Sequence, residues 1–290
     1  MDYVGNIFRP PSEASSLILQ VTVGCTHNKC TFCSMYKDKK FRIKPIETVL
    51  DDLQGARKRY RHVDRIFLAD GDALCLTTDK LMVILNAIRE TFPECERVGI
   101  YSRATHILSK TPEELAQLAK AGIGIAYIGA ESGSDEVLLR IDKGETAEQI
   151  TKAVKMAEAA GIQASVTFIS GLGGKELLKE HATKTGKMIS EMGASYVGFL
   201  SLVLSPGVPL YADVQSGKFE LITPFELMEE LEIILEHSNC KKETVLRSNH
   251  ASNWLALKGT LPQDKNRLLD QVRRAKTDKG LLRAGGQRHL

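Results

Sequence analysis

A repeated alternation of helix and strand patterns limits the fold of this chain most strongly. Three predicted helices end in a small residue and a glycine, at Gly122, Gly161 and Gly193, and each passes directly into a strand rich in β-branched or aromatic residues. This alternation is typical of parallel βα units. The predicted strands span residues 17–23, 65–69, 97–102, 123–129, 164–169 and 196–204. Six such strands suit an open, incomplete barrel in an α/β fold.

Capping residues mark where several of the helices begin. At three of these starts, a threonine precedes a proline or is followed three residues later by a glutamate or glutamine. At the fourth, a proline is expected as the first helical residue. These positions are Thr111-Pro112, Thr146 with Gln149, Thr223 with Glu226, and Pro45.

The composition changes along the chain and predicts three segments. Residues 1–16 are polar with Pro10-Pro11, which indicates an extended lead-in. Residues 17–210 carry the βα pattern, and residues 211–290 form a mainly helical C-terminal extension packed on the barrel, with helices at 223–236 and 263–276. The last residues, 277–290, are glycine-rich and basic and indicate a frayed tail.

The charge and the cysteine content narrow the class of protein. Lys and Arg number 39 against 36 Asp and Glu, a net charge of +3 that gives no support for a nucleic-acid partner. No stretch reaches the roughly 18 apolar residues of a membrane helix, so no membrane association and a cytoplasmic location are expected. Cys75, Cys95 and Cys240 are far apart and suit core positions in a reducing compartment.

The other three cysteines, Cys25, Cys30 and Cys33, follow the first strand within nine residues, with spacing CX4CX2C. A loop can turn three thiolates toward one metal or cluster. The spacing matches neither paired zinc knuckles nor a thioredoxin motif. Three alternatives stay open from the residues alone: a Cys3His zinc site that includes His27, an iron–sulfur electron carrier or sensor, and a set of structural thiols.

The motif, with the aromatic Phe32 before its last cysteine and the βα repeat after it, resembles the radical S-adenosylmethionine (SAM) superfamily. This chain has one residue more in the first gap than the usual spacing of that family. The resemblance implies a partial (β/α)6 TIM-like barrel, a [4Fe–4S] cluster held by the three cysteines, and SAM bound at the open iron. Residues 128–144 resemble the branch that contains methylthiotransferases and oxygen-independent coproporphyrinogen oxidase.

The resemblance also implies which residues contact SAM. These residues lie at or shortly after the ends of the second to fifth predicted strands, or beside the cysteines. They are Phe32, Gly71, Asp72, Ser102, Glu131, Arg140 and Ser170. Asp70-Gly71-Asp72 replaces the Gly-Gly-Glu of the family. The expected reaction is reductive cleavage of SAM to a 5′-deoxyadenosyl radical, which takes hydrogen from an unidentified small molecule in an anaerobic enzyme supplied with electrons by ferredoxin or flavodoxin.

A polar segment in the extension supplies candidate catalytic residues. Residues 247–254 combine amide, imidazole, hydroxyl and guanidinium groups, and an incomplete barrel needs a segment to cover its mouth. Asn249, His250 and Asn253 are expected to face the barrel opening and contact substrate or SAM, with His250 as proton donor or acceptor. An ordinary polar surface loop is the alternative.

Overall fold

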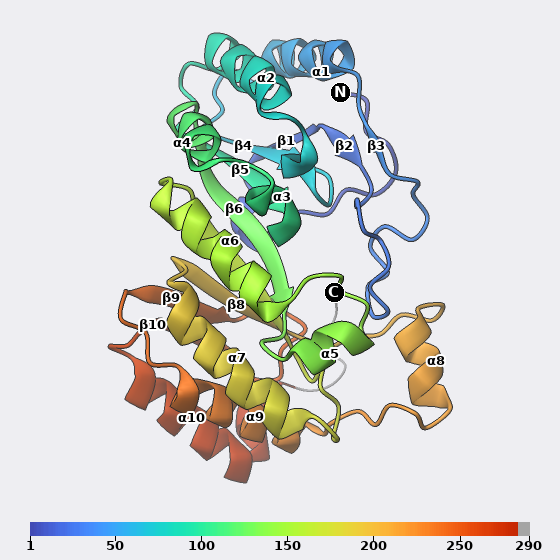
Figure 1. Cartoon of the computed structure of the whole chain (residues 1–290), viewed down its shortest axis with the longest axis vertical. Coiled ribbons are helices and arrows are strands. Elements are labelled where there is room, and N and C mark those ends of the chain that lie inside the picture. Colours follow the sequence, from blue (N-terminus) through green and yellow to red (C-terminus); the bar gives the residue numbers. More distant parts are fainter. Residues whose placement is uncertain (284–290) are drawn as a thin grey trace. The chain divides into compact units, whose positions relative to one another are not determined.

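The computed structural model describes residues 1–283, and the chain divides into two compact units (Figure 1). The first unit consists of Met1–Asn28, Met35–Ile128 and Met156–Ala164. The second contains Lys29–Ser34 and Gly129–Lys155 and continues from Ser165 to the C-terminal part of the chain. Three elements cross the division: β6 (Ile123–Glu131), α6 (Ala147–Ala159) and β7 (Gln163–Ser170).

The first unit is built on a parallel sheet with the strand order β1-β4-β5-β6. Its strands are β1 (Leu17–Gln20), β2 (Thr22–Val23), β3 (Arg42–Ile43), β4 (Arg65–Ala69) and β5 (Arg97–Ser102). Its helices are α1 (Ile46–Arg59), α2 (Thr78–Thr91), α3 (Ala104–Leu108) and α4 (Pro112–Lys120), with short 3-10 turns at Pro11–Glu13 and Ala73–Cys75. Four consecutive residues of β4, 66–69, are completely buried, as expected for a parallel strand covered on both faces.

Two local expectations for this unit were wrong. The run 17–23 is two strands, because β1 pairs with β4 while Thr22 and Val23 of β2 pair with β3 in a separate two-stranded sheet. Pro45 is the residue before α1 and not its first helical residue, since its ψ of 137° is extended. Both errors concern the exact boundaries of an element and not its existence.

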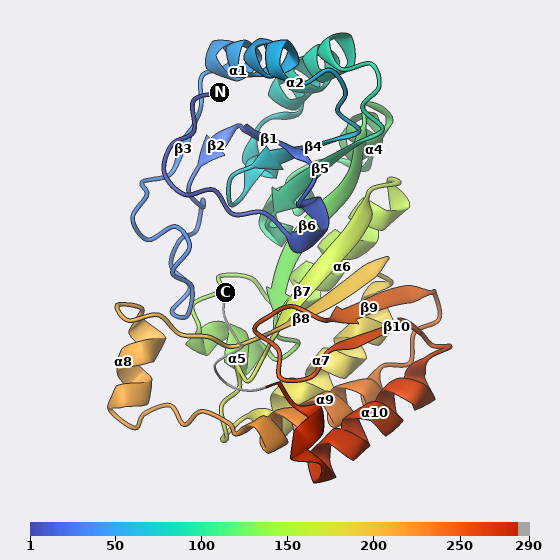
Figure 2. The ribbon, with the colours of Figure 1, turned by 180° about the vertical axis from the view of Figure 1, so that it is seen from behind.

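The second unit has the strand order β7-β8-β9-β10, in which β10 alone is antiparallel. Its own strands are β8 (Tyr196–Ser201), β9 (Thr244–Ser248) and β10 (Leu257–Leu261). Its helices are α5 (Asp135–Arg140), α7 (Leu178–Met192), α8 (Pro209–Gln215), α9 (Pro224–His237) and α10 (Lys265–Thr277), with a 3-10 turn at Lys279–Leu281. Helix α9 packs between α7 and α10, and seen from behind, β8–β10 lie in front of α7 (Figure 2).

All six predicted strands exist, although the last ends at Ser201 and not at residue 204. The extension is mainly helical as expected, but its β9–β10 hairpin was not predicted, because residues 247–254 were interpreted as a polar loop. The capping pairs at Thr111, Thr146 and Thr223 are confirmed: in each, the threonine hydroxyl accepts from the third following backbone N–H and the Glu or Gln side chain bonds back.

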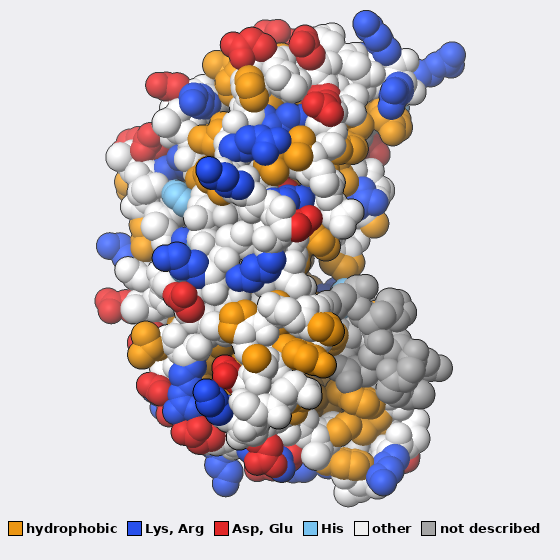
Figure 3. Space-filling view, turned by 90° about the vertical axis from the view of Figure 1, so that its right-hand side faces the viewer, with side chains coloured by type: hydrophobic (Ala, Val, Ile, Leu, Met, Phe, Trp, Pro, Cys, Tyr) orange, Lys and Arg blue, Asp and Glu red, His pale blue; other side chains and the backbone are white. Residues whose placement is uncertain are grey.

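Charged side chains of both signs occur on one face of the molecule. Lys and Arg side chains are interspersed with Asp and Glu on the face shown in Figure 3, consistent with the net charge of +3. Within residues 1–283, no helix combines the length and apolar character needed to span a bilayer. The end of the predicted tail, residues 284–290, lies outside the described residues.

Candidate active site

The cysteine loop begins directly after β2. Cys25, Cys30 and Cys33 are all half-buried, and none forms a disulfide. Cys25 belongs to the first unit, and Cys30 and Cys33 to the second. In the first unit the side-chain amide of Asn28, itself at a φ of +48°, donates to the Tyr36 carbonyl at 2.7 Å. In the second, Thr31 N donates to the Ile141 carbonyl at 2.9 Å, which ties the loop to the residues after α5.

The end of β4 lies against the start of this loop. A Cβ atom added at Gly71 would lie 2.6 Å from the Tyr36 ring and 3.1 Å from Cys25 Cβ. Glycine is therefore needed for the backbone to pass so close to the first cysteine. The neighbouring Asp70 is buried, and its Oδ2 accepts from Lys39 Nζ at 3.0 Å and from Gly24 N at 3.2 Å.

Asp72 is buried and connects three segments of the first unit. Its carboxylate accepts from the Thr26 hydroxyl, from Arg103 N at 3.1 Å and from His106 Nδ1 at 2.6 Å. Ser102, at the end of β5, is buried, and its hydroxyl donates to the Arg103 carbonyl. The sequence analysis missed His106, because a histidine in a five-residue helix has no distinguishing pattern. The role of Asp72 in SAM binding stays a prediction, and its structural contacts are those of a clamp on the cysteine loop.

The end of β6 holds a largely buried ion pair within the second unit. Glu131 has a φ of +67°, and its Oε1 lies 3.2 Å from Lys143 Nζ. A Cβ at Gly129 would collide with that same oxygen, so glycine makes room for the carboxylate. Burial by itself would lower the pKa of Lys143, but Glu131 and Glu145, with Cys30 nearby, raise it above its usual range. A non-glycine residue with positive φ at a strand end is the kind of strain found at functional sites.

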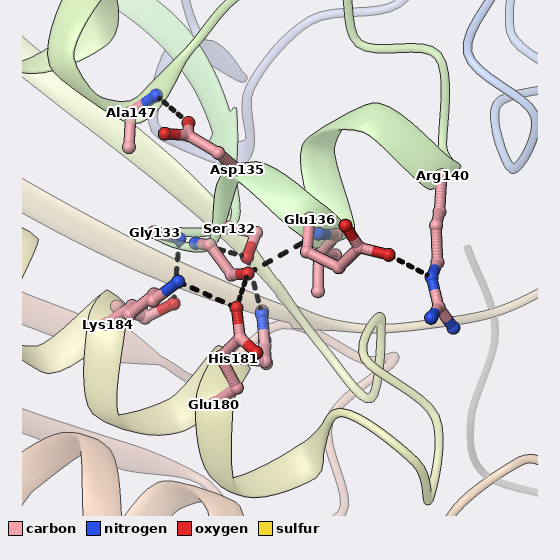
Figure 4. A network of polar contacts seen from close by, with 12 residues as sticks. Ser132, Gly133, Asp135, Glu136, Arg140, Ala147, Glu180, His181 and Lys184 are labelled. Atoms are coloured by element: carbon pink, nitrogen blue, oxygen red, sulfur yellow. Dashed lines mark hydrogen bonds and ion pairs between the residues drawn. The ribbon is translucent and has the colours of Figure 1, made fainter.

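Arg140, which the sequence indicated as a partner of SAM, is exposed at the end of α5. Its guanidinium binds Glu176 through two hydrogen bonds of 2.7 and 2.8 Å and Glu136 through one of 2.8 Å. Figure 4 shows this side chain directed away from the buried Ser132–His181 contact. Its role in SAM binding stays a prediction. Lys143, three residues later and buried, was missed because its approach to Glu131 depends on the turn after α5.

Ser170, at the end of β7, belongs to a second buried polar group. Its hydroxyl is buried, and the next residue, Gly171, donates its N–H to both oxygens of Glu230 at 3.0 and 3.1 Å. His181 Nε2 lies 3.8 Å from Glu230, and its Nδ1 lies 2.8 Å from the Ser132 hydroxyl. Burial raises the pKa of Glu230 to about 8 and lowers that of His181 to about 4. The contact of Ser170 with SAM stays a prediction.

The polar segment after β9 is anchored to β8. The Asn253 side chain is buried, donates to the Phe199 carbonyl at 2.7 Å and accepts from the Ser201 hydroxyl at 3.1 Å. His250 is half-buried with Nδ1 at 2.9 Å from the Ser252 hydroxyl, and Asn249 is exposed. The Asn253 side chain therefore fixes this segment to the end of β8. Contact of Asn249, His250 and Asn253 with substrate or SAM stays a prediction.

The chemistry of the donor set fits an iron–sulfur cluster. Cys25, Cys30 and Cys33 are three soft thiol ligands without a fourth cysteine nearby in sequence, which leaves one iron of a four-iron cluster for another ligand. In the described part of the chain, no group of three or more His, Cys, Asp or Glu side chains is arranged to hold a single metal ion. At Cys75, outside the motif, burial and then Asp72 raise the pKa of the thiol to about 12.

Comparison with known families gives one match. The family described as the radical SAM superfamily matches residues 19–182, more than half of the chain, and this range contains all three clustered cysteines.

Two curated proteins are similar over part of their length. An uncharacterized methyltransferase from Pyrococcus horikoshii is 27% identical over 197 residues, covering 67% of this chain and 41% of that protein. The 4′-phospho-dehydrooxetanocin synthase of Priestia megaterium is 28% identical over 186 residues, covering 58% of this chain and 25% of that protein. The chain thus spans less than half the length of either relative.

Among solved structures, coproporphyrinogen III oxidase (HemN) from Escherichia coli, a radical SAM enzyme, is similar with a TM-score of 0.57. The sequences are 18% identical, and the match covers 77% of this chain and 52% of HemN. This likeness confirms the predicted fold class, an α/β partial barrel of the TIM-like type.

Proposed function

The chain belongs to the radical SAM superfamily, and we propose that it cleaves SAM reductively and uses the resulting radical on a small molecule. It is an enzyme of a family whose members bind a [4Fe–4S] cluster and SAM. The observation that carries the proposal is the set of three half-buried thiols on the loop after β2, with Gly71 backbone held close to the first of them. A zinc-binding or electron-transfer role is not favoured, because the matched family and HemN carry out SAM chemistry.

Cys25, Cys30 and Cys33 would hold the cluster. When bound, the cluster and SAM together supply the electron, the C5′–S cleavage and the 5′-deoxyadenosyl radical that takes hydrogen from substrate. Asp72 orients the start of the loop through Thr26, and the Ile141 carbonyl orients the second half through Thr31 N. Within each unit, these contacts limit how far the loop backbone beside the thiols can move.

Several residues of this chain would bind SAM. We assign contacts to the strand-end residues predicted from the sequence, and add Lys143 as a second cation besides Arg140. Glu131 accepts from Lys143 through Oε1. A buried cation beside a carboxylate can neutralise the carboxylate of a bound amino acid through a charge-assisted hydrogen bond. The proposed SAM contacts are Phe32, Gly71, Asp72, Ser102, Glu131, Arg140, Lys143 and Ser170.

The substrate and the electron donor are proposals as well. One relative is named as a synthase of a phosphorylated product and HemN as an oxidase of coproporphyrinogen III, both small molecules, whereas the methyltransferase name gives no substrate, so the names do not point to one reaction. We assign a small-molecule substrate and a flavodoxin or ferredoxin as reductant. We also assign Asn249, His250 and Asn253 to a segment that covers the barrel opening and contacts substrate or SAM. In this role the half-buried imidazole of His250 is a proton donor or acceptor.

The test is anaerobic reconstitution with iron and sulfide. The parent protein is expected to bind four irons per chain and, with dithionite and SAM, to form 5′-deoxyadenosine. The Cys25→Ala/Cys30→Ala/Cys33→Ala variant should keep its circular dichroism spectrum and lose the brown chromophore. A matched control is Cys240→Ala, a cysteine buried in the second unit away from the motif. Four irons per chain in the triple variant, or zinc in place of iron in the parent, would contradict the proposal.

A further inference from the structure

Four strands of the second unit align one residue each in a single row. Thr167 of β7 pairs with Gly198 of β8, Gly198 pairs with Arg247 of β9, and Arg247 lies opposite Lys258 of β10. Residues in register on neighbouring strands point to the same face of a sheet. We call Thr167, Gly198, Arg247 and Lys258 the cross-strand row.

The face that carries this row is the one without helices of the second unit. Residues that alternate with it, such as Val166, Val197, Leu246 and Leu257, are buried. Helix α10 packs against β10, and its Asp264 and Arg267 approach Gly259, the neighbour of Lys258. Arg247 and Lys258 are exposed, and Thr167 and Gly198 are half-buried. Figure 2 shows β9 and β10 from the side opposite α7.

The row contains two cations and no acid. Strands β7, β8, β9 and β10 contain no Asp or Glu. Among the described residues, the contacts of the Arg247 guanidinium are Nη1 to the carbonyls of Leu246 at 2.8 Å and Gly259 at 3.3 Å. These bonds lay the guanidinium over the β9–β10 pair and leave Nε and Nη2 with no bond to any described residue.

Two features of the row lower the stability of the folded protein. Like charges directly opposite each other on antiparallel strands are destabilising. Glycine inside a strand also weakens it, and commonly marks a close approach by a ligand. A Cβ at Gly198 would meet no atom nearer than 4.0 Å, so packing does not require glycine there. Because Gly198 has no side chain, an opening is left beside Arg247 and next to the Thr167 hydroxyl.

We propose that the cross-strand row is a subsite for an oxyanion of the substrate, a carboxylate or a phosphate. Arg247 Nε and Nη2 form the fork that matches such a group, Lys258 adds a second positive charge, and Thr167 adds a hydroxyl donor. Gly198 provides the space. The subsite deepens the proposed function, on which it rests, by assigning the substrate an acidic end.

The position of the row along the strands suits a substrate that extends along the sheet. Gly198 lies three residues before Ser201, the last residue of β8, which is about 10 Å along the strand. The C-terminal ends of such strands are where the chemistry of βα barrels takes place. An oxyanion bound at Arg247 would therefore leave the opposite end of a small substrate free to reach the strand ends.

Titration calorimetry on the as-purified protein, without dithionite or SAM, tests the subsite. Inorganic phosphate and succinate are the two probes, in chloride buffer, and they distinguish a phosphate from a carboxylate site. One saturable site is expected in the parent. Arg247→Gln and Lys258→Gln should each weaken it about tenfold, the loss expected for one charge-assisted contact, and Arg247→Lys should weaken it less. Lys218→Gln, at an exposed lysine outside the row, should bind as the parent does.

A stability readout separates binding from folding. Without added anion, Lys258→Gln should melt at a higher temperature than the parent, because it removes the opposed charges, and phosphate should raise the melting temperature of the parent more than that of the variant. No saturable binding by the parent, or equal binding by the parent and both glutamine variants, would overturn the subsite. Since the titration needs no SAM cleavage, 5′-deoxyadenosine formation tests the proposed function separately.

Discussion

The carboxylate after β4 is buried and the one at the end of β6 is largely buried, but their surroundings differ. Asp72 accepts from the Thr26 hydroxyl, a backbone N–H and His106, all from its own unit. Glu131 faces a single cation, Lys143, through one oxygen, on a backbone with positive φ. The difference indicates that Asp72 mainly holds the cysteine loop in place, whereas Glu131 keeps bonding capacity for a ligand.

A third buried carboxylate, Glu230, extends the comparison. Among the described residues, its carboxylate accepts from the Gly171 N–H and lies 3.8 Å from the imidazole of His181. Burial raises the pKa of Glu230 to about 8, while the Gly171 N–H and Ser170 act in the opposite direction. A buried acid without a close cation therefore keeps its proton at neutral pH, whereas the acid beside Lys143 has a cation to pair with.

The largest effect is expected from Asp72→Ala. It leaves three donors without their acceptor in a buried site, so we expect a loss of about 4 kcal/mol in the free energy of unfolding. Urea denaturation measures it, and reconstituted iron content should fall because Thr26 no longer fixes the start of the loop. Asp72→Asn, which keeps one acceptor oxygen, is the matched control and should lose less. If the parent and Asp72→Ala had equal free energies of unfolding, the difference proposed between the roles of Asp72 and Glu131 would be contradicted.

The next effect concerns the cation beside Glu131. Lys143→Met should lower the free energy of unfolding by about 3 kcal/mol, because the largely buried Glu131 and the buried Glu145 both lose their cation. SAM affinity, measured by anaerobic calorimetry, should fall at least about tenfold.

Arg140→Gln is the control for this experiment. Its exposed ion pairs are expected to contribute under about 1 kcal/mol, and loss of SAM affinity only in this variant would favour Arg140 over Lys143 as the SAM partner.

A pH-dependent effect is expected from Glu230→Gln. The unfolded carboxyl loses its proton near pH 4.5, whereas the folded one keeps it to about pH 8, so this group's contribution to stability declines between those values. From pH 6.5 to pH 8 the parent should lose about 2 kcal/mol relative to the variant, which does not titrate. Denaturant unfolding at the two pH values measures this, and His181 is common to both proteins. A constant difference would mean that Glu230 is ionised in the folded protein.

The smallest effects come from the two strand-end glycines. Gly71→Ala places a methyl group against the buried Tyr36 ring, and we expect a loss of about 2 kcal/mol in the free energy of unfolding. Gly129→Ala meets the side-chain ends of Glu131 and Lys143, so it should cost less stability but displace the carboxylate and weaken SAM binding. Melting curves and SAM calorimetry on both variants check this, and a reversed order would contradict the roles assigned to the two strand ends.

Much of the architecture could be read from the sequence, because it depends on neighbours close in the chain. The capping threonines at positions 111, 146 and 223 act within one helical turn, and the apolar runs of β4 and β5 were assigned to the residue. The cysteine motif was also evident, but the residues alone left several alternatives open, and the family followed from a resemblance of the motif and the βα repeat. The positions of Asp72 and Glu131 at strand ends followed from the same pattern.

What the tertiary structure alone decided are pairings between residues distant in the chain. The sequence indicated Arg140 as a SAM contact, which stays a prediction, whereas the pairing of the buried Lys143 with Glu131 depends on the turn after α5. His106 and Glu230 carried no signal, since their roles exist only through contact with Asp72 and Gly171. The β9–β10 register, which sets Arg247 opposite Lys258, likewise depends on strand pairing, and a polar segment such as residues 247–254 does not specify its pairing by hydrophobic pattern.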